Sequence, residues 1–166
     1  METKQGTVAV TLTVNGEKRV GVAEPRMLLS DFLRHGLGMT GTHVGCEQGV
    51  CGACTVLIDG QPGRSCLAFA VQVEGATVDT VEGMAEPGEL SDVQQAFRAE
   101  HGLQCGFCTP GFLASTQALL EQNPDPTDDE IREYLSGNVC RCTGYQGIIA
   151  AVRRVATERK AASHDA

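Results

Sequence analysis

Apolar and polar residues alternate near the start of the chain, as they do in a half-buried β-strand. The apolar positions of this stretch are Val8, Val10, Leu12 and Val14. Asn15-Gly16 follows directly, and this dipeptide favours the two-residue turn of a β-hairpin. The pattern therefore predicts a strand, a tight turn and a return strand that contains Val20 and Val22.

The rest of the first half is predicted to complete a small sheet with one helix. One face of a short helix is indicated by the apolar residues Met27, Leu28, Phe32 and Leu33. Pro25 precedes this segment and Gly36 follows it, as is typical of helix boundaries. Residues 55–58, followed by Asp59-Gly60, predict another strand and turn, and residues 76–81 predict one more short strand.

Capping signals in the second half predict four helices. Ser91 stands before the first helix, and Thr109 before Pro110 at the start of the second. Thr127 and Glu130 have the spacing of a capping box ahead of the third helix. The apolar face of the fourth helix consists of Ile148, Ile149, Val152 and Val155. We expect the chain to fray beyond the end of that helix, near Arg159.

The change from alternating to helical periodicity predicts an α+β fold with two units. A chain of 166 residues is long enough for two small units packed together. Residues 83–88 read GMAEPG, and this glycine and proline content is typical of a linker. We therefore expect a sheet unit over residues 1–82, a linker over residues 83–90 and a helical unit over residues 91–166.

Charge and composition narrow the range of functions. The formal net charge of -8 disfavours a nucleic-acid partner, because phosphate binding depends on clustered Lys and Arg. The N-terminal segment carries Glu2 and lacks the apolar core of a secretory signal, and no run approaches the ~20 apolar residues of a membrane span. We therefore expect a cytoplasmic location, where structural disulfides are rare. The 8 cysteines of the chain then point to metal binding.

The cysteines fall into two sets of four, one in each predicted unit. The first set is Cys46, Cys51, Cys54 and Cys66. Its spacing, C-x4-C-x2-C with a distant fourth cysteine, is that of plant-type [2Fe-2S] ferredoxins. The glycines at positions 45, 49 and 52 suit a loop that must adopt positive φ angles and direct backbone N–H groups at sulfur.

The second set is Cys105, Cys108, Cys140 and Cys142. One pair is expected just before the second helix and the other just before the fourth. Two helix N-termini would then offer free N–H donors and partial positive charge to an anionic cluster. This placement favours an iron-sulfur cluster over a disulfide.

Other uses of eight cysteines are weighed against this hypothesis. Zinc accepts four thiolates, but paired cysteines in structural zinc sites are usually two to four residues apart, and only one residue separates Cys140 from Cys142. A thioredoxin-like dithiol needs one isolated C-x-x-C, and a Rieske centre needs two histidine ligands. We interpret His35, His43 and His101 as ordinary polar residues. Residues 36–41 match a dinucleotide-binding fingerprint, but they follow a predicted helix and not a strand, so we assign them to a turn.

Three motifs together resemble the small iron-sulfur subunit of the molybdenum hydroxylases, the family of xanthine dehydrogenase, aldehyde oxidase and CO dehydrogenase. They read GCEQGVCGAC, QCGFCTPG and GNVCRCTGYQ, and the resemblance extends from about residue 8 to about residue 155. It implies a β-grasp, plant-type [2Fe-2S] ferredoxin-like domain followed by a four-helix-bundle domain. Each domain would hold one [2Fe-2S] cluster on its own set of four cysteines.

The resemblance also implies partner chains and a direction of electron flow. A large subunit would carry the molybdopterin cofactor and the substrate, and a medium subunit would carry FAD. The three chains would form a heterotrimer, or a dimer of heterotrimers. Electrons would pass one at a time from molybdenum to the second cysteine set, then to the first set, and then to FAD.

Gln104, beside Cys105, corresponds by resemblance to a glutamine that contacts the pterin. The simpler alternative is a glutamine at a helix end that bonds to solvent. No catalytic group is indicated in this chain, so we expect no substrate turnover from it alone. The alternative function is a free-standing carrier of the ferredoxin type with two clusters, for which an acidic charge is suitable.

Overall fold

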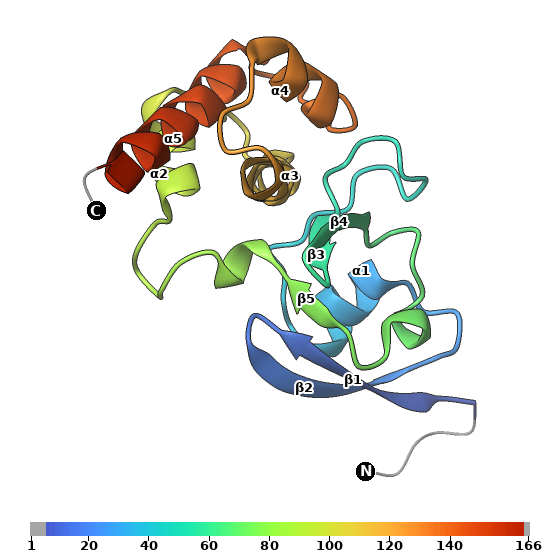
Figure 1. Cartoon of the computed structure of the whole chain (residues 1–166). Helices are drawn as coiled ribbons and strands as arrows, with labels where there is room; N and C mark the ends of the chain where they lie inside the picture. Colours follow the sequence, from blue (N-terminus) through green and yellow to red (C-terminus); the bar gives the residue numbers. More distant parts are fainter. Residues whose placement is uncertain (1–5, 165–166) are drawn as a thin grey trace.

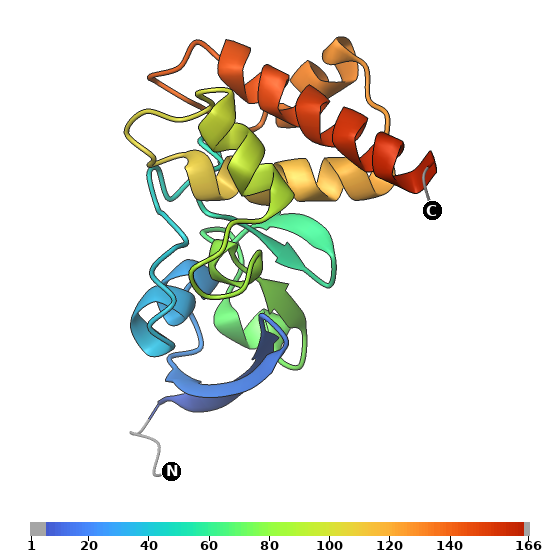
Figure 2. The same cartoon turned by 90° about the vertical axis from the view of Figure 1, so that its left-hand side faces the viewer.

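The computed structural model describes residues 6–164, and their fold is mixed α+β. Figure 1 shows a sheet at one end of the molecule and helices α2 to α5 at the other end, and Figure 2 shows the same two layers from the side. The sheet has five strands in the order β2-β1-β5-β3-β4. None of the helices within the described residues has the length and hydropathy that a membrane crossing needs.

The predicted hairpin at the start of the chain is confirmed. Strand β1 (Val8–Val14) pairs with the antiparallel strand β2 (Glu17–Ala23). Asn15 and Gly16 both have positive φ angles, 51° and 79°, as the tight turn requires. The return strand buries Gly21 and Ala23, whereas Val20 is 54% exposed. A Cβ atom on Gly21 would lie 2.6 Å from the ring of Phe32, so this glycine makes room for the aromatic side chain.

The predicted short helix is present in two pieces. Helix α1 (Leu29–Asp31) continues into a turn of π-helix, η1 (Phe32–Gly36), that covers the sheet. The apolar core between these elements consists of Val10, Leu12, Val14, Ala23, Leu29, Phe32, Leu33, Val56, Ala70 and Val78. This core lies at the sheet end of the molecule, between the sheet and the helical segment α1–η1.

The remaining strands are shorter or less obvious than the sequence pattern predicts. Strand β3 (Thr55–Ile58) is where it was expected, and the strand expected over residues 76–81 is β5 (Thr77–Asp79). Between them lies β4 (Gln61–Arg64), which the sequence pattern does not predict. It contains Pro62, which lacks a backbone N–H, and such residues are tolerated in an edge strand. Two 3-10 turns, η2 (Ala70–Val73) and η3 (Val81–Gly83), flank β5.

The four predicted helices are present. They are α2 (Asp92–Ala99), α3 (Thr109–Gln122), α4 (Asp128–Leu135) and α5 (Gln146–His164). Ser91 caps α2 by accepting a bond from the N–H of Gln94, and the Thr127/Glu130 capping box precedes α4.

Two details of the helix ends differ from the prediction. Thr109 lies inside α3, and Cys108 occupies the N-cap position without a side-chain capping bond. Helix α5 does not fray at Arg159 but continues to His164. Arg159 pairs with Asp92, and Lys160 pairs with Asp125, so side-chain bonds to other parts of the helical layer hold these turns.

The helices enclose a second apolar core, separate from that of the sheet. Its buried members are Val93, Ala96, Phe97, Phe112, Leu113, Leu119, Leu120, Ile131, Leu135, Cys140, Ile148, Ile149, Ala151, Val152, Val155 and Ala156. Helix α3 joins the two layers, because Ala114 and Ala118 pack on Leu57 of β3. Gly111 of α3 lies so close to Gly52 that a Cβ atom would collide with its carbonyl oxygen. The loops that carry the two cysteine sets therefore meet beside α3.

Candidate metal centres

The first cysteine set lies in the long loop before β3 and in the segment after β4. Cys54 and Cys66 are buried, while Cys46 and Cys51 are partly exposed. The thiols form two pairs, because Cys46 is within hydrogen-bonding reach of Cys51, and Cys54 of Cys66. This set therefore has one inner pair and one outer pair of sulfur atoms.

The backbone of this loop directs N–H groups at sulfur. Backbone hydrogen bonds from Gln48 and from Cys51, whose nitrogen lies 3.4 Å from Cys46 Sγ, lower the pKa of the Cys46 thiol to about 7. Gly49 and Gly52 have the expected positive φ angles, 77° and 73°. Glu47 also has a positive φ angle, so the loop does not use glycine alone for this conformation.

Gly45 has a different role from the one expected for it. It is absent from the described residues with positive φ, so the sequence prediction for this glycine is wrong. A Cβ atom at this position would lie 3.1 Å from the Phe107 ring and 3.3 Å from Cys51 Sγ. The small residue is needed because the loop of the second cysteine set packs against it.

The second cysteine set lies where the start of α3 meets the segment before α5. The Sγ atoms of Cys105 and Cys142 are 3.6 Å apart, and both residues are exposed. The Cys108 thiol is within hydrogen-bonding reach of Cys140, which is buried. This set also consists of one inner pair and one outer pair.

The inner pair of the second set has opposing pKa shifts. Burial, followed by the neighbouring Cys140, raises the pKa of the Cys108 thiol to about 12. Burial also raises that of Cys140, but hydrogen bonds from Thr143, from the backbone of Cys142 and from Cys108 together outweigh burial, and the net pKa of Cys140 is lowered. The donors of Thr143 are its hydroxyl and its N–H, 3.1 and 3.4 Å from Cys140 Sγ. These two donors favour the thiolate form of Cys140.

The second set was expected at the N-termini of two helices, and this holds for one of the two. Cys108 immediately precedes α3, but three residues separate Cys142 from the start of α5. Tyr145 fills this gap with a φ angle of 69°, and its hydroxyl accepts a bond from the N–H of Cys140 at 3.0 Å. Tyr145 and Thr143 shape this loop, and the spacing of the cysteines indicates a role for neither of them.

The grouping of sulfur atoms in pairs indicates the kind of metal centre that fits. A structural zinc ion takes four ligands around a single centre. A [2Fe-2S] cluster held by four cysteines has two iron atoms, so each iron takes a pair of thiolates. Both sets fit a [2Fe-2S] cluster.

Gln104 lies at the rim of the second set. Its Nε2 atom donates to the carbonyl oxygen of Cys142 at 3.1 Å, and the side chain is exposed. The glutamine thus links the segment of Cys105 to the segment of Cys142. This bond to the chain differs from the simple bond to solvent that was the alternative.

His43 takes part in the contact between the two loops. Its Nδ1 atom lies 2.8 Å from the carbonyl oxygen of Phe107 and donates to it. The two rings are stacked with their centroids 5.1 Å apart. This contact joins the start of the first cysteine loop to Phe107, one of the two residues between Cys105 and Cys108.

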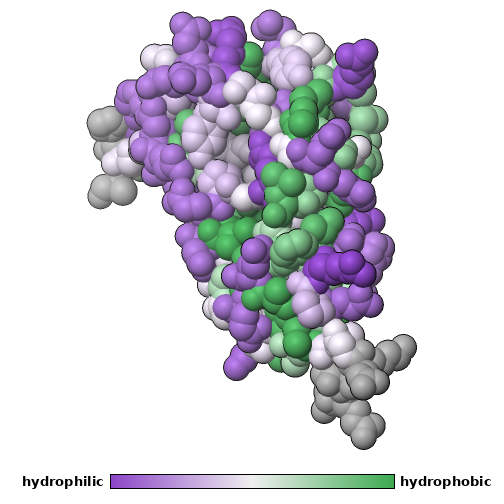
Figure 3. Space-filling model, turned by 90° about the vertical axis from the view of Figure 1, so that its right-hand side faces the viewer, coloured by the Kyte–Doolittle hydropathy of each residue, from purple (hydrophilic) through white to green (hydrophobic). Residues whose placement is uncertain are grey.

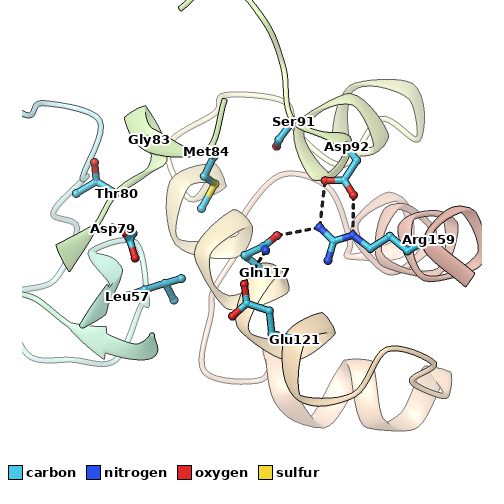
Figure 4. A pocket seen from close by; sticks show the side chains of 10 residues that line it. All are labelled: Leu57, Asp79, Thr80, Gly83, Met84, Ser91, Asp92, Gln117, Glu121 and Arg159. Carbon is cyan, nitrogen blue, oxygen red and sulfur yellow. Dashed lines mark hydrogen bonds and ion pairs between the residues drawn. The ribbon is translucent and has the colours of Figure 1, made fainter. Parts of the chain in front are cut away.

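A cavity of about 300 Å³ lies away from the cysteines, between the sheet and helices α3 and α5. None of the eight cysteines lines it. Figure 4 shows Arg159 bonded to Asp92 and Gln117, Gln117 bonded to Glu121, and Asp79 on the side of the cavity that the sheet forms. Burial, followed by the charge of Glu121, raises the pKa of the Asp79 carboxyl.

Large apolar side chains are exposed next to several of the cysteines. Val50 precedes Cys51 and is 65% exposed, and Leu67 follows Cys66 and is 61% exposed. Phe107, between Cys105 and Cys108, is 48% exposed. Figure 3 shows a band of apolar side chains along one face of the molecule. Exposed apolar surface of this kind often marks contact with another protein.

The fold and the cysteine sets define an iron-sulfur protein of the [2Fe-2S] class. A family model described as "[2Fe-2S] binding domain" matches residues 80–153. The chain is 55% identical over 149 residues to the caffeine dehydrogenase subunit gamma of Pseudomonas sp. (strain CBB1), and the match covers 88% of this chain and 89% of the relative. It is 52% identical over 145 residues to the nicotine 6-hydroxylase small subunit of Paenarthrobacter nicotinovorans, with 87% of each covered.

A solved structure gives the same result. Quinoline 2-oxidoreductase from Pseudomonas putida 86 has a chain that is 51% identical, with a TM-score of 0.91, and the match covers 98% of this chain and 100% of that one. The chain belongs to the small iron-sulfur subunits of the molybdenum hydroxylases.

Proposed function

We propose that this chain holds two [2Fe-2S] clusters and relays electrons between two partner chains. The first cluster would bind Cys46, Cys51, Cys54 and Cys66, and the second Cys105, Cys108, Cys140 and Cys142. The observation that carries this proposal is the arrangement of each set as two pairs of thiols. Each pair suits one iron atom of a two-iron cluster.

The two clusters would lie in two domains. We place a β-grasp, plant-type ferredoxin-like domain over residues 1–82, a linker over residues 83–90 and a four-helix-bundle domain over residues 91–166. The separate apolar cores of the sheet and the helices support this division. Residues 1–5 and 165–166 of these domains lie outside the described part of the chain.

The chain is an electron-transfer subunit of an oxidoreductase, and it has no catalytic role of its own. When bound, the clusters would supply sites that take up and release single electrons. The protein keeps the inner thiols away from water and directs N–H and hydroxyl donors at Cys46 and Cys140. Hydrogen bonds to cluster sulfur are among the factors that set reduction potentials.

The partners that we propose are a large molybdopterin-binding subunit and a medium FAD-binding subunit, in a heterotrimer or a dimer of heterotrimers. Electrons would pass from molybdopterin to the second cysteine set, then to the first set and to FAD. Exposed Val50, Leu67 and Phe107 beside the cysteines support a surface that partner chains cover. A cytoplasmic location remains part of this proposal. A free-standing carrier is not favoured, because the relatives are named as subunits.

Gln104 is proposed as the contact to the pterin of the large subunit. Its exposed side chain at the rim of the second set supports this role. In the assembled enzyme, Gln104→Ala should slow reduction of the clusters by substrate while both clusters remain assembled. Rapid mixing with substrate measures this rate, and an unchanged rate would leave the glutamine with only its bond to Cys142.

Purification of the native protein tests the proposed assembly. The chain should elute from a gel-filtration column with two other chains, well above its own 17.5 kDa. Elution of the cluster-loaded chain alone, from cells that produce the whole enzyme, would support the free-standing carrier instead. The purified chain on its own should be bleached by dithionite and restored by air, and it should oxidise no substrate.

A further inference from the structure

The last two cysteines of the second set lie on a segment that packs directly against the first cysteine loop. The N–H of Val139 donates to the carbonyl oxygen of Cys51 at 2.9 Å. Val139 is bonded to Cys140, so one hydrogen bond joins a cysteine of one set to the residue beside a cysteine of the other. The distance between the two sets therefore depends on how firmly this segment is held.

Asn138 holds the segment through a buried side chain. It is only 3% exposed, and its Nδ2 atom donates to the carbonyl oxygen of Gly52 at 3.2 Å. Its Oδ1 atom accepts a bond from the Ser115 hydroxyl of α3 at 3.0 Å. An amide is suited to this position because it provides one donor and one acceptor at the same time.

Arg64 makes a second, independent link across the same junction. Its guanidinium donates to the carbonyl oxygen of Gly137 at 2.6 Å and also to the Thr55 hydroxyl. That hydroxyl donates in turn to the carbonyl oxygen of Gly52 at 2.6 Å. Arg64 thus connects the residue before Asn138 to the first cysteine loop.

The close fit at Gly52 shows that the junction has little free space. A Cβ atom on this glycine would lie 2.5 Å from the Gly137 carbonyl oxygen and 2.7 Å from the Asn138 amide. Buried polar groups are costly unless they are paired, so this network has one preferred arrangement. The hydrogen bonds of Asn138 and Arg64 fix the segment in that arrangement.

We propose that Asn138 is a positioning residue that, with Arg64, sets the separation and orientation of the two cysteine sets for electron transfer between them. This inference rests on the proposed two-cluster relay. Neither residue is a metal ligand, and neither is needed to fill an apolar core. Electron tunnelling slows steeply with distance, so a looser junction would slow the relay without removing either cluster.

The test uses Asn138→Leu in the assembled enzyme, because leucine keeps the approximate volume, adds no charge and removes both hydrogen bonds. Iron analysis first establishes that both clusters are present. The magnetic coupling between the two reduced clusters, measured by EPR, and the rate of electron transfer between them are then compared with the unaltered enzyme. We expect a weaker magnetic coupling, or a broader distribution of couplings, and a slower electron transfer between the clusters. The two reduction potentials should be unchanged.

Two further variants make the test specific. Ser115→Ala removes the contact on the α3 side but leaves the bond from Asn138 to Gly52, so its coupling should match that of the unaltered enzyme. Arg64→Gln should weaken the coupling as Asn138→Leu does. Unaltered coupling and transfer in both Asn138→Leu and Arg64→Gln would overturn the proposal, and so would loss of a cluster in both. If the unaltered enzyme itself lacks two cluster signals, the proposed function fails first.

Discussion

Replacement of Gly52 by alanine should destabilise the protein far more than the same change at Gly60. Both glycines have left-handed backbone angles, with φ of 73° and 78°, so alanine at either position costs about 1–2 kcal/mol. A Cβ atom on Gly60 meets nothing within 4 Å, but at Gly52 it lies 2.5 Å from the Gly137 carbonyl oxygen. Overpacking of this kind adds about 1–3 kcal/mol.

The difference between the two variants therefore isolates the contact between the two cysteine loops. Loss of clusters makes unfolding irreversible, so the measure is the rate at which the visible bands bleach in a fixed concentration of guanidinium. If this contact is already broken in the transition state for unfolding, the Gly52→Ala variant should bleach roughly 5- to 150-fold faster than the Gly60→Ala variant. Equal rates for the two variants would refute the close packing at this junction.

Two other predictions concern single side chains. Cys108→Ser should remove one reduced-state EPR signal, and Cys54→Ser the other; loss of both signals or of neither in these variants would contradict the assignment of ligands to two sets. Asp79→Asn should stabilise the protein at neutral pH, because burial and Glu121 raise the pKa of this carboxyl and disfavour its charged form in the folded state. The gain in stability is therefore complete at pH values above the pKa of Asp79 in the folded state. It disappears as the pH falls through that pKa towards the pKa of Asp79 in the unfolded chain. Bleaching rates at several pH values test this, and a gain that grows with acidification would show that the sign is wrong.

The sequence predicts those parts of the fold whose signals are local. The turn at Asn15-Gly16 and the capping box at Thr127 depend on neighbouring residues, and both are where they were predicted. Strand β4 was missed because Pro62 and Gly63 disfavour a strand except at a sheet edge, and a sequence pattern does not reveal where that edge lies.

The cysteine sets could be recognised from spacing, but the residues that join them could not. Asn138 and Gly52 are far apart in the sequence and meet only because α3 packs on β3. Arg64 ends an unpredicted strand, so nothing in the sequence indicated its bond to Gly137. Gly45 was assigned a backbone role, whereas the structure shows it in close contact with Phe107 from the other loop. These contacts depend on tertiary packing.

Spin quantification by EPR tests the central proposal most directly. The purified chain, fully reduced with dithionite, should show two distinguishable signals that together integrate to about two unpaired electrons per chain, one from each [2Fe-2S] cluster. A sample with about one unpaired electron per chain would mean that only one cysteine set holds a cluster. A colourless chain that contains zinc and gives no signal would contradict the two-cluster relay altogether.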